Sequence, residues 1–310
     1  MLDNIKSSHI LKIIFKNLSK RLFLILIINN NNLQKRLNIS IDTYIKYSNQ
    51  IEIEIIPNKI KLVNQNKFID IFDEEYKPFY HIYFNDGNEE IDRNYFTINE
   101  NISKIKVLID MEVKSIQGLF SECYCIKEIK FIKFNRTDFK NYKSMFYYCL
   151  NLINIDISKL KTNNVENMEN MFDTCEVLTK LDLSNFNTDN VNKMHNMFDR
   201  CNSLKELNIS TFNTNNVKDM SYMFIYCKSL MKLDLSNFNT NKVNDMKKLF
   251  YGCSSLKELN ISNFIFSIST NIKYMFGECS EELKKYIRNI FNNLDNTIFE
   301  ENKDFLETID

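Results

Sequence analysis

Residues 171–224 read MFDTCEVLTKLDLSNFNTDNVNKMHNMFDRCNSLKELNISTFNTNNVKDMSYMF, and this stretch holds one 26-residue pattern twice over. Cys175 and Cys201 stand 26 residues apart, and each follows a Phe by three residues. The same step runs through seven of the eight cysteines, which are Cys123, Cys149, Cys175, Cys201, Cys227, Cys253 and Cys279. A fixed period of roughly 20–50 residues is typical of repeat architectures, in which each period forms one structural unit. We call each unit a coil.

Two spacings alternate within each coil. Apolar residues at steps of three and four predict one face of a short helix, as in the run Val165, Met168, Met171, Phe172, Cys175 and Leu178. Leu181 and Leu183 then alternate with polar residues, which predicts a short strand. Thr162 and Thr188 precede the next apolar run and are typical of a helix N-cap region. Asn tolerates a left-handed backbone, which would explain how the turns form with only 4 Gly in the chain.

Each coil is therefore expected to contain one strand, one turn and one short helix. A single coil cannot bury its apolar face, but stacked coils can. We expect an α/β solenoid, a right-handed and leucine-rich-repeat-like stack with a parallel sheet whose strands lie about 4.8 Å apart. Residues 98–280 would form seven to eight such coils.

The flanking segments lack the period and are expected to form three further parts. Residues 1–50 contain apolar stretches at 10–18 and 22–28, which predict helices. Residues 51–97 contain alternating runs such as 51–55, which predict a β-rich cap paired onto the first coil. Together these two parts would make an α+β N-terminal cap. Residues 281–310 are expected to form a helical C-terminal cap, because apolar residues recur at helical spacing: Leu283, Tyr286, Ile287, Ile290 and Phe291.

The Phe and Cys positions fall at the same place in every coil, so stacking would align them in columns. We favour a buried ladder, because free Cys is among the most buried residue types. An odd number of seven Cys argues against a disulfide column, and the lack of a nearby His argues against a metal site. Cys125 lies outside the period and is the better candidate for a reactive thiol. The predicted structural ladder comprises Phe146, Cys149, Phe172, Cys175, Phe198, Cys201, Phe224, Cys227, Phe250 and Cys253.

The polar residues of each predicted strand point away from the buried Leu and define a candidate partner-binding face. One row alternates in charge through Lys180, Glu206, Lys232 and Glu258. The next row reads Asp156, Asp182, Asn208, Asp234 and Asn260. Neutralisation between neighbouring strands explains the first row, and we favour it over a docking role. The second row does not neutralise itself, so it would meet a basic partner or, weakly, a cation.

The composition excludes several classes of protein. The 40 Lys and Arg balance the 40 Asp and Glu, so the chain lacks the field expected of a nucleic-acid binder. None of the 4 Gly forms a phosphate-binding loop, and the 3 His are scattered. Asp182, Ser184 and His195 are near in sequence, but the Ser and the acidic residue recur as repeat consensus. We therefore expect no enzyme, no cofactor and no metal site.

The stretch quoted above combines MFxxC, LDLSNFNT and NVxxM, and it resembles the BspA-type leucine-rich repeat family. The resemblance is to the branch first catalogued as a mycoplasma domain of unknown function, and the motifs cover about residues 98–280. It implies a leucine-rich-repeat-like solenoid. Bacterial surface members of the family are associated with adhesion and protein binding, and the resemblance implies no catalytic residues.

These observations favour a non-enzymatic protein–protein interaction module that presents its sheet face to a protein partner. One alternative is an adaptor, because residues 9–48 are similar to F-box segments, which would imply recruitment of a ubiquitin-ligase scaffold. Another is a surface adhesin of the BspA type. The apolar run 22–28 is too short to span a bilayer and makes a poor signal peptide. We therefore expect a monomer without a transmembrane segment, in the cytoplasm rather than at the cell surface.

Overall fold

The computed structural model describes residues 7, 10, 30–37, 45–46, 48–58, 65–291 and 294–301. The chain divides into two compact units, residues 1–50 and 51–310. In the first unit, α3 (Asn31–Leu37) follows Asn30, whose side-chain oxygen accepts a hydrogen bond from the N–H of Leu33 at 3.0 Å. This bond satisfies one of the free N–H groups at the start of the helix. The helices expected over 10–18 and 22–28 lie, apart from Ile10, outside the described residues.

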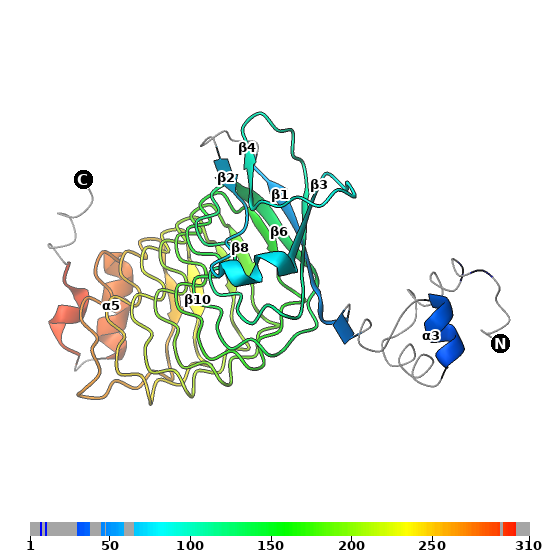
Figure 1. Cartoon of the computed structure of the whole chain (residues 1–310). Coiled ribbons are helices and arrows are strands. Elements are labelled where there is room, and N and C mark those ends of the chain that lie inside the picture. The colour runs from blue at the N-terminus through cyan, green and yellow to red at the C-terminus, as the bar shows by residue number, and fades with distance from the viewer. Residues whose placement is uncertain are drawn as a thin grey trace. The chain divides into compact units, whose positions relative to one another are not determined.

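A five-stranded sheet opens the second unit, with the strand order β3–β5–β1–β6–β7. Figure 1 labels its strands β1, β3 and β6. The strands are β1 (Ile51–Pro57), β3 (Tyr80–Phe84), β5 (Ile105–Ile109), β6 (Ile126–Lys133) and β7 (Asn154–Asp156). In β1, Ile51, Ile53 and Ile55 are fully buried, whereas Glu52 and Glu54 point outward to lysines of the neighbouring chain segments. β1 pairs antiparallel with β5 and with β6. Because β6 is the strand of the coil that contains Cys123, the cap and the first repeats share one sheet.

Two smaller elements complete this cap. β2 (Gln65–Lys67) and β4 (Tyr95–Thr97) form an antiparallel pair. The short 3₁₀ helix η2 (Glu74–Phe79) begins after Asp73, whose side chain accepts a hydrogen bond from the N–H of Glu75. The bond anchors the first turn of η2, and the chain then continues directly into β3.

The helix expected in each coil does not form, since the described residues 98–280 contain no α-helix. The segment runs instead through consecutive turns, in which the N–H of Cys175 donates to the carbonyl oxygen of Phe172 at 3.1 Å. Every second N–H group donates a hydrogen bond to the next coil. For example, the N–H of Phe172 donates to the carbonyl oxygen of Met197 at 2.9 Å. Such turns place apolar side chains inside at steps of three and four. The sequence pattern is therefore the same as that of a helix.

Two residues in each coil have a positive φ, four positions apart, and they interrupt any continuous helix. The pairs are Gly118 and Glu122, Ser144 and Tyr148, Asn170 and Thr174, Asn196 and Arg200, Tyr222 and Tyr226, Lys248 and Gly252, and Tyr274 and Glu278. The predicted left-handed Asn occurs at Asn170 and Asn196, but most of these positions hold other residue types. Asn187 serves its turn differently, because its side-chain oxygen accepts the N–H of Asp189 at 3.0 Å.

Thr188, which was predicted to cap a helix, and its repeat equivalent Thr214 link neighbouring coils instead. Thr188 Oγ1 accepts a hydrogen bond from the N–H of Asn213 at 2.7 Å and donates to the carbonyl oxygen of Asn213 at 3.0 Å. Thr214 makes the same two bonds with Asn239. Both threonines are buried. Each hydroxyl therefore satisfies one N–H and one carbonyl group of the following coil.

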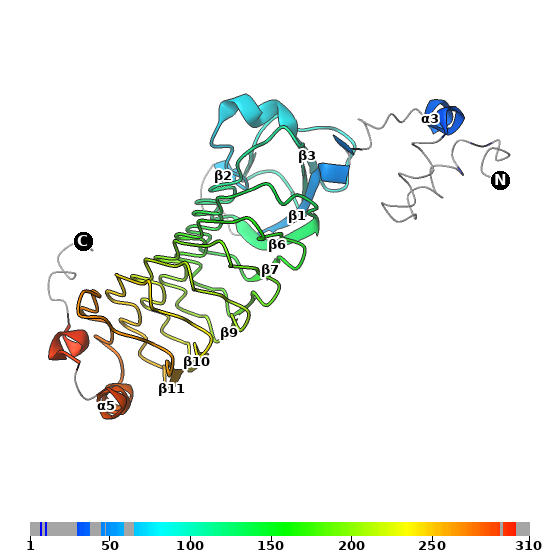
Figure 2. The ribbon, with the colours of Figure 1, turned by 90° about the horizontal axis from the view of Figure 1, so that it is seen from below.

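The repeat strands beyond β7 are three residues long and pair in twos, not as one continuous sheet. β8 (Lys180–Asp182) pairs in parallel with β9 (Glu206–Asn208), and β10 (Lys232–Asp234) pairs in parallel with β11 (Glu258–Asn260). Strand pairing joins neither β7 to β8 nor β9 to β10. A second line of parallel bridges continues across these breaks, through Asn141, Asn167, Lys193, Asp219, Asp245 and Asn271. Successive coils thus remain in register as a stack (Figure 2).

Columns of Phe and Cys form the core of the stack. The rings at the repeat position from Phe120 to Phe276 lie nearly parallel, with centroids 5.1–5.9 Å apart. The thiol of each repeat Cys from Cys149 to Cys279 donates to the carbonyl oxygen of the Phe in the preceding coil, at 3.0–3.3 Å. All eight cysteines are free and buried. The thiols therefore fill the core and satisfy backbone carbonyl groups.

Cys125 is not the accessible reactive thiol that its position outside the period suggests. It is buried, and its Sγ donates to the carbonyl oxygen of Lys67 at 3.0 Å. Burial raises the pKa of the Cys125 thiol to about 12. Because the thiolate is the reactive form, Cys125 is an inert structural residue at neutral pH.

The C-terminal part covers the last coil with α5 (Glu281–Ile290) and the 3₁₀ helix η3 (Asn296–Phe299). Leu283 and Ile287 of α5 are buried, whereas Tyr286 and Ile290 are exposed, contrary to the prediction that they face the last coil. The N–H of Phe276 donates to the carbonyl oxygen of Ile298 at 2.7 Å. η3 therefore takes the place of a further coil in the hydrogen-bond pattern. No helix within the described part of the chain is long and apolar enough to cross a membrane.

Candidate functional site

The outward side of strands β6–β11 is the candidate site, and we call it the sheet face. Leu181 and Leu233 point into the core, while the residues on either side of each point to solvent. Equivalent side chains of successive coils line up in rows because the coils stack in register. The Lys/Glu row consists of Lys180, Glu206, Lys232 and Glu258. The Asp/Asn row consists of Asp156, Asp182, Asn208, Asp234 and Asn260.

The Lys/Glu row forms ion pairs only within each pair of strands. Lys180 Nζ lies 2.6 Å from Glu206 Oε2, and Lys232 Nζ lies 2.9 Å from Glu258 Oε2. The Lys180 side chain is 69% exposed, so solvent weakens its attraction to Glu206. The predicted neutralisation between neighbouring strands is thus present in β8–β9 and in β10–β11. The four side chains remain available to a second molecule.

The Asp/Asn row has a structural role that the sequence reasoning missed. Asp182 Oδ1 accepts the N–H of Ser184 at 3.0 Å, and Asn208 Oδ1 accepts the N–H of Ser210 at 3.3 Å. Each side chain thereby holds the turn that follows its strand. The hydrogen bond from the Ser184 N–H also holds the pKa of the Asp182 carboxyl below its usual range. Asp and Asn accept this bond alike, so the negative charge at Asp182 and Asp234 is not needed for the turn.

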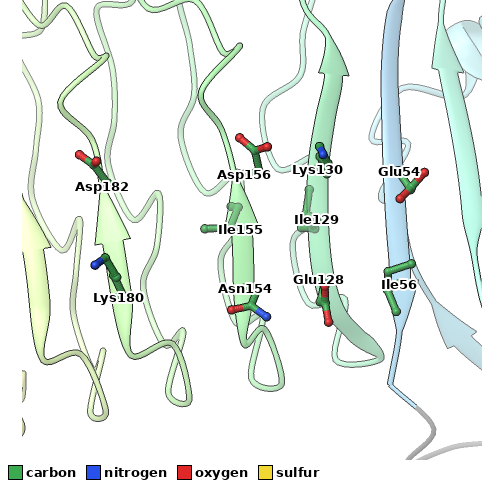
Figure 3. A pocket seen from close by; sticks show the side chains of 10 residues that line it. All are labelled: Glu54, Ile56, Glu128, Ile129, Lys130, Asn154, Ile155, Asp156, Lys180 and Asp182. Carbon is green, nitrogen blue, oxygen red and sulfur yellow. The ribbon is translucent and has the colours of Figure 1, made fainter.

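The first hollow of the sheet face extends from β1 across β6 and β7 to β8 and has a volume of about 390 Å³. Figure 3 shows its lining side chains, which come from β1, β6, β7 and β8. They are Glu54, Ile56, Glu128, Ile129, Lys130, Asn154, Ile155, Asp156, Lys180 and Asp182. Isoleucines thus lie among charged groups, and carboxylates outnumber lysines. This combination suits a ligand with an apolar part beside donor groups.

The second hollow lies at the other end of the sheet face and has a volume of about 340 Å³. β10 and β11 line it together with Lys257 and Tyr286. Tyr286 belongs to α5, and its side chain keeps 46% of its surface exposed. The helix that covers the last coil therefore also supplies an aromatic side chain to the sheet face.

The structure adds residues to the candidate site that the sequence reasoning missed. Extending the Lys/Glu row backward in steps of 26 residues reaches Asn154 and then Glu128, and extending the Asp/Asn row by one step reaches Lys130, so the repeat period gives a signal for them. Glu54 comes from β1 and Tyr286 from α5, which lie outside the repeats. Their places depend on how the caps pack onto the stack, and no spacing in the sequence reports that.

A second group of titratable residues lies inside the stack. Asp173 and Asp199 occupy equivalent positions in adjacent coils and are both buried. Burial raises the pKa of Asp173 to about 6, and burial together with the Asp173 charge raises the pKa of Asp199 to about 7. Arg200 Nη1 lies 3.6 Å from Asp199 Oδ2, too far for a strong hydrogen bond. Among the described residues, no group of three or more His, Cys, Asp and Glu is placed to hold a metal ion.

The repeat region matches a known protein family. The family model described as "Mycoplasma protein of unknown function, DUF285" matches residues 92–181, 114–225 and 175–290. Together the three matches cover well over half of the 310 residues. The chain belongs to this family. The DUF285 matches overlap one another, as expected where one model fits a repeated sequence at several positions.

The DUF285 description carries no function. The adhesion and protein binding that the BspA-type resemblance implies therefore stay predictions. No curated protein and no solved structure matches the chain. In this DUF285 protein, the sheet face combines exposed rows of charged side chains with two hollows.

Proposed function

We propose that the repeats form a leucine-rich-repeat-like solenoid that binds a protein partner through its sheet face without catalysis. The observation that carries the proposal is the regular presentation of charged side chains above two hollows. The sheet face offers Lys, Glu and Asp at fixed positions along the stack, and it offers apolar surface at both ends through Ile155 and Tyr286. A protein surface can engage such an array at several points at once.

The geometry favours an extended contact over a small-molecule site. The two hollows lie at opposite ends of the sheet face, between β1 and α5, and the Lys/Glu row runs from one to the other. Protein interfaces combine a few aromatic or apolar anchors with a polar rim. In the proposed interface, Tyr286 and the half-buried Ile56 and Ile155 serve as anchors, and the two rows serve as the rim.

The proposal is tested by removing charge from the sheet face without disturbing its turns. In the variant Asp182→Asn with Asp234→Asn, each Asn retains the acceptor for the following Ser N–H. The full chain is cross-linked to its partner in its own cells, and the amount of partner retained is measured by quantitative mass spectrometry. We expect this variant to retain at least fivefold less partner than the wild type.

The matched control is Glu166→Gln, which neutralises one exposed carboxylate of the Lys140–Glu166 ion pair, away from the repeat strands. The control should retain the partner at the wild-type level. Equal retention by the sheet-face variant would place the binding surface elsewhere.

The adaptor and adhesin functions stay predictions. Most of residues 9–48, which carry the similarity to F-box segments, lies outside the described residues. A cross-linking experiment on the full chain also addresses the adaptor, because a ubiquitin-ligase scaffold among the retained proteins would favour it. Loss of that scaffold on replacing residues 9–48 would assign its recruitment to this segment.

A further inference from the structure

The Lys/Glu row is complementary to itself when it is reversed. Read from β8 to β11, the charges run Lys180, Glu206, Lys232, Glu258; read backward, each Lys falls on a Glu. The point of reversal lies between β9 and β10, where strand pairing is interrupted. A rotation of 180° about an axis parallel to the strands at this point reverses the row. A second copy placed by this rotation faces the first with opposite charges.

We propose, building on the proposed function, that the protein partner of the sheet face is a second copy of this chain. The two faces meet around a two-fold axis parallel to the strands, between β9 and β10. Lys180 then faces Glu258 of the second copy, and Glu206 faces Lys232 of the second copy. A two-fold contact uses the same patch on both chains and is the commonest symmetry of homo-oligomers. The inference departs from the monomer predicted from the sequence.

The ion pairs within each chain strengthen this arrangement. The Lys180–Glu206 pair of one chain lies across from the Lys232–Glu258 pair of the other, in reversed order. The four charges form a square in which each Lys has a Glu beside it and another across from it. Intramolecular neutralisation and docking are therefore compatible, since each charge keeps its partner and gains a second one.

The Asp/Asn row obeys the same symmetry. The rotation brings Asp182 onto Asn260 of the second copy and Asn208 onto Asp234 of the second copy. A carboxylate accepts hydrogen bonds, and an amide can donate two. Each pair therefore combines an acceptor with a donor, whereas the unreversed register would set Asp against Asp.

The two ends of the sheet face also fit each other. Tyr286 lies at the β10–β11 end, and the rotation carries it to the β7–β8 end of the other chain. There the half-buried Ile155 lines the first hollow (Figure 3). The exposed ring of each chain thus meets the apolar part of the other chain's first hollow. Two such contacts, one at each end, give the interface its anchors.

The dimer is expected to be weak and sensitive to salt. Six strands about 4.8 Å apart and three residues wide cover roughly 300 Å² per copy, against about 800 Å² per partner in stable complexes. Charged contacts that remain close to solvent are screened as ionic strength rises. We expect association of the full chain at concentrations near 0.5 mM and low salt, and dissociation in about 0.5 M NaCl.

The test uses two complementary variants of the full chain. The acidic-row variant is Lys180→Glu with Lys232→Glu, and the basic-row variant is Glu206→Lys with Glu258→Lys. Each variant alone sets like charges against each other and should sediment as a monomer at 0.5 mM. A one-to-one mixture should form a heterodimer at least tenfold tighter than the wild-type dimer, by sedimentation equilibrium. Circular dichroism checks that both variants are folded.

The dimer experiment has one control variant and three outcomes that would contradict the proposal. Lys140→Glu disrupts an ion pair between coils elsewhere, whose Lys is as exposed as Lys180, and it should leave the dimer unchanged. A monomeric mixture, or a wild-type chain that stays monomeric at 0.5 mM in low salt, overturns the proposal. Self-association of the basic-row variant would contradict the proposed alignment of the two copies. In that case the row of lysines would have to face the Asp/Asn row of the second copy instead of the Lys/Glu row.

The outcome also separates this inference from the proposed function. The wild-type chain could be monomeric while the variant Asp182→Asn with Asp234→Asn loses a foreign protein that the wild type retains. That result would support the proposed function and refute the dimer. If neither dimer formation nor binding of a foreign partner depends on the sheet face, both the dimer proposal and the proposed function are refuted.

Discussion

Single side chains in the repeats satisfy backbone groups that regular helices would satisfy internally. Thr188 and Thr214 serve the next coil through their hydroxyls, and Asp182 and Asn208 hold the turn after each strand. The cysteine thiols donate to carbonyl groups of the preceding coil. Each of these side chains is therefore tied to a backbone position. Asp199 differs from them, because its Oδ1 is buried without a hydrogen-bond partner.

We predict that Asp199→Asn stabilises the protein increasingly as pH rises. The folded-state pKa of Asp199 is about 7, above the value of about 3.9 for an unfolded Asp. A raised carboxyl pKa means that the folded protein binds the proton more tightly than the unfolded chain does. The stability from this group is thus fully present below pH 4 and is lost as pH rises toward 7. Asn carries no charge, so the variant avoids this loss.

The measurement compares the melting temperature of variant and wild type at pH 5, 6.5 and 8. The difference should favour the variant by a few degrees at pH 8 and should be smaller at pH 5. Asp156→Asn serves as a control, since burial is not the main influence on that carboxyl. A difference that is constant over this pH range would contradict the pKa argument.

The coil is the element whose structure the sequence predicted only in part. The 26-residue step correctly indicates which residues stack, because register between coils depends on period alone. The alternation around Leu181 and Leu233 likewise identifies the outward residues of the sheet face. The helix was wrong, because consecutive turns with left-handed residues such as Tyr222 and Lys248 bury side chains at the same steps. Few of these left-handed positions hold Gly or Asn, so the residue types did not indicate a left-handed backbone there.

At the scale of the coil, we predict that Thr188→Val destabilises the protein by about 1–3 kcal/mol. Val has nearly the same shape but lacks the hydroxyl that bonds to the N–H and carbonyl oxygen of Asn213. Both backbone groups would then lack this partner in a buried site. Urea unfolding followed by circular dichroism measures the loss. Thr179→Val, at an exposed position, should change stability far less, and equal effects would refute the role given to Thr188.

The second unit as a whole combines a stack of coils with different covers at its two ends. At one end, β1 pairs with β6 and extends the sheet. At the other, α5 buries Leu283 and Ile287, and η3 accepts hydrogen bonds from the last coil. Tyr286 shows that the second cover also shapes the sheet face. The sequence predicted that these parts cover the two ends, but it did not predict that Tyr286 would contribute to the sheet face, because helical spacing placed Tyr286 on the buried side of its helix.

We predict that removing residues 281–310 makes the protein aggregate. The deletion exposes the apolar side of the last coil, including Phe276, whose ring stacks on Phe299 with centroids 6.1 Å apart. It also frees the N–H groups of Tyr274 and Phe276, which donate to η3. Light scattering and dye binding to exposed apolar surface measure the outcome. Ending the chain after Glu301 keeps α5 and η3 and should leave the protein soluble; a soluble monomer from both truncations would show that the cover is dispensable.

The direction of the hydrogen bonds between coils has a mechanical consequence. Bonds such as that from the Phe172 N–H to the Met197 carbonyl oxygen join one coil to the next, so they run along the stack. Pulling on the two ends of the repeats therefore loads the coil boundaries in series, each carrying the full force. Boundaries without strand pairing, between β7 and β8 and between β9 and β10, have fewer bonds to share that force. Under tension the repeats would open first at these two places, leaving the β8–β9 and β10–β11 pairs as intact blocks.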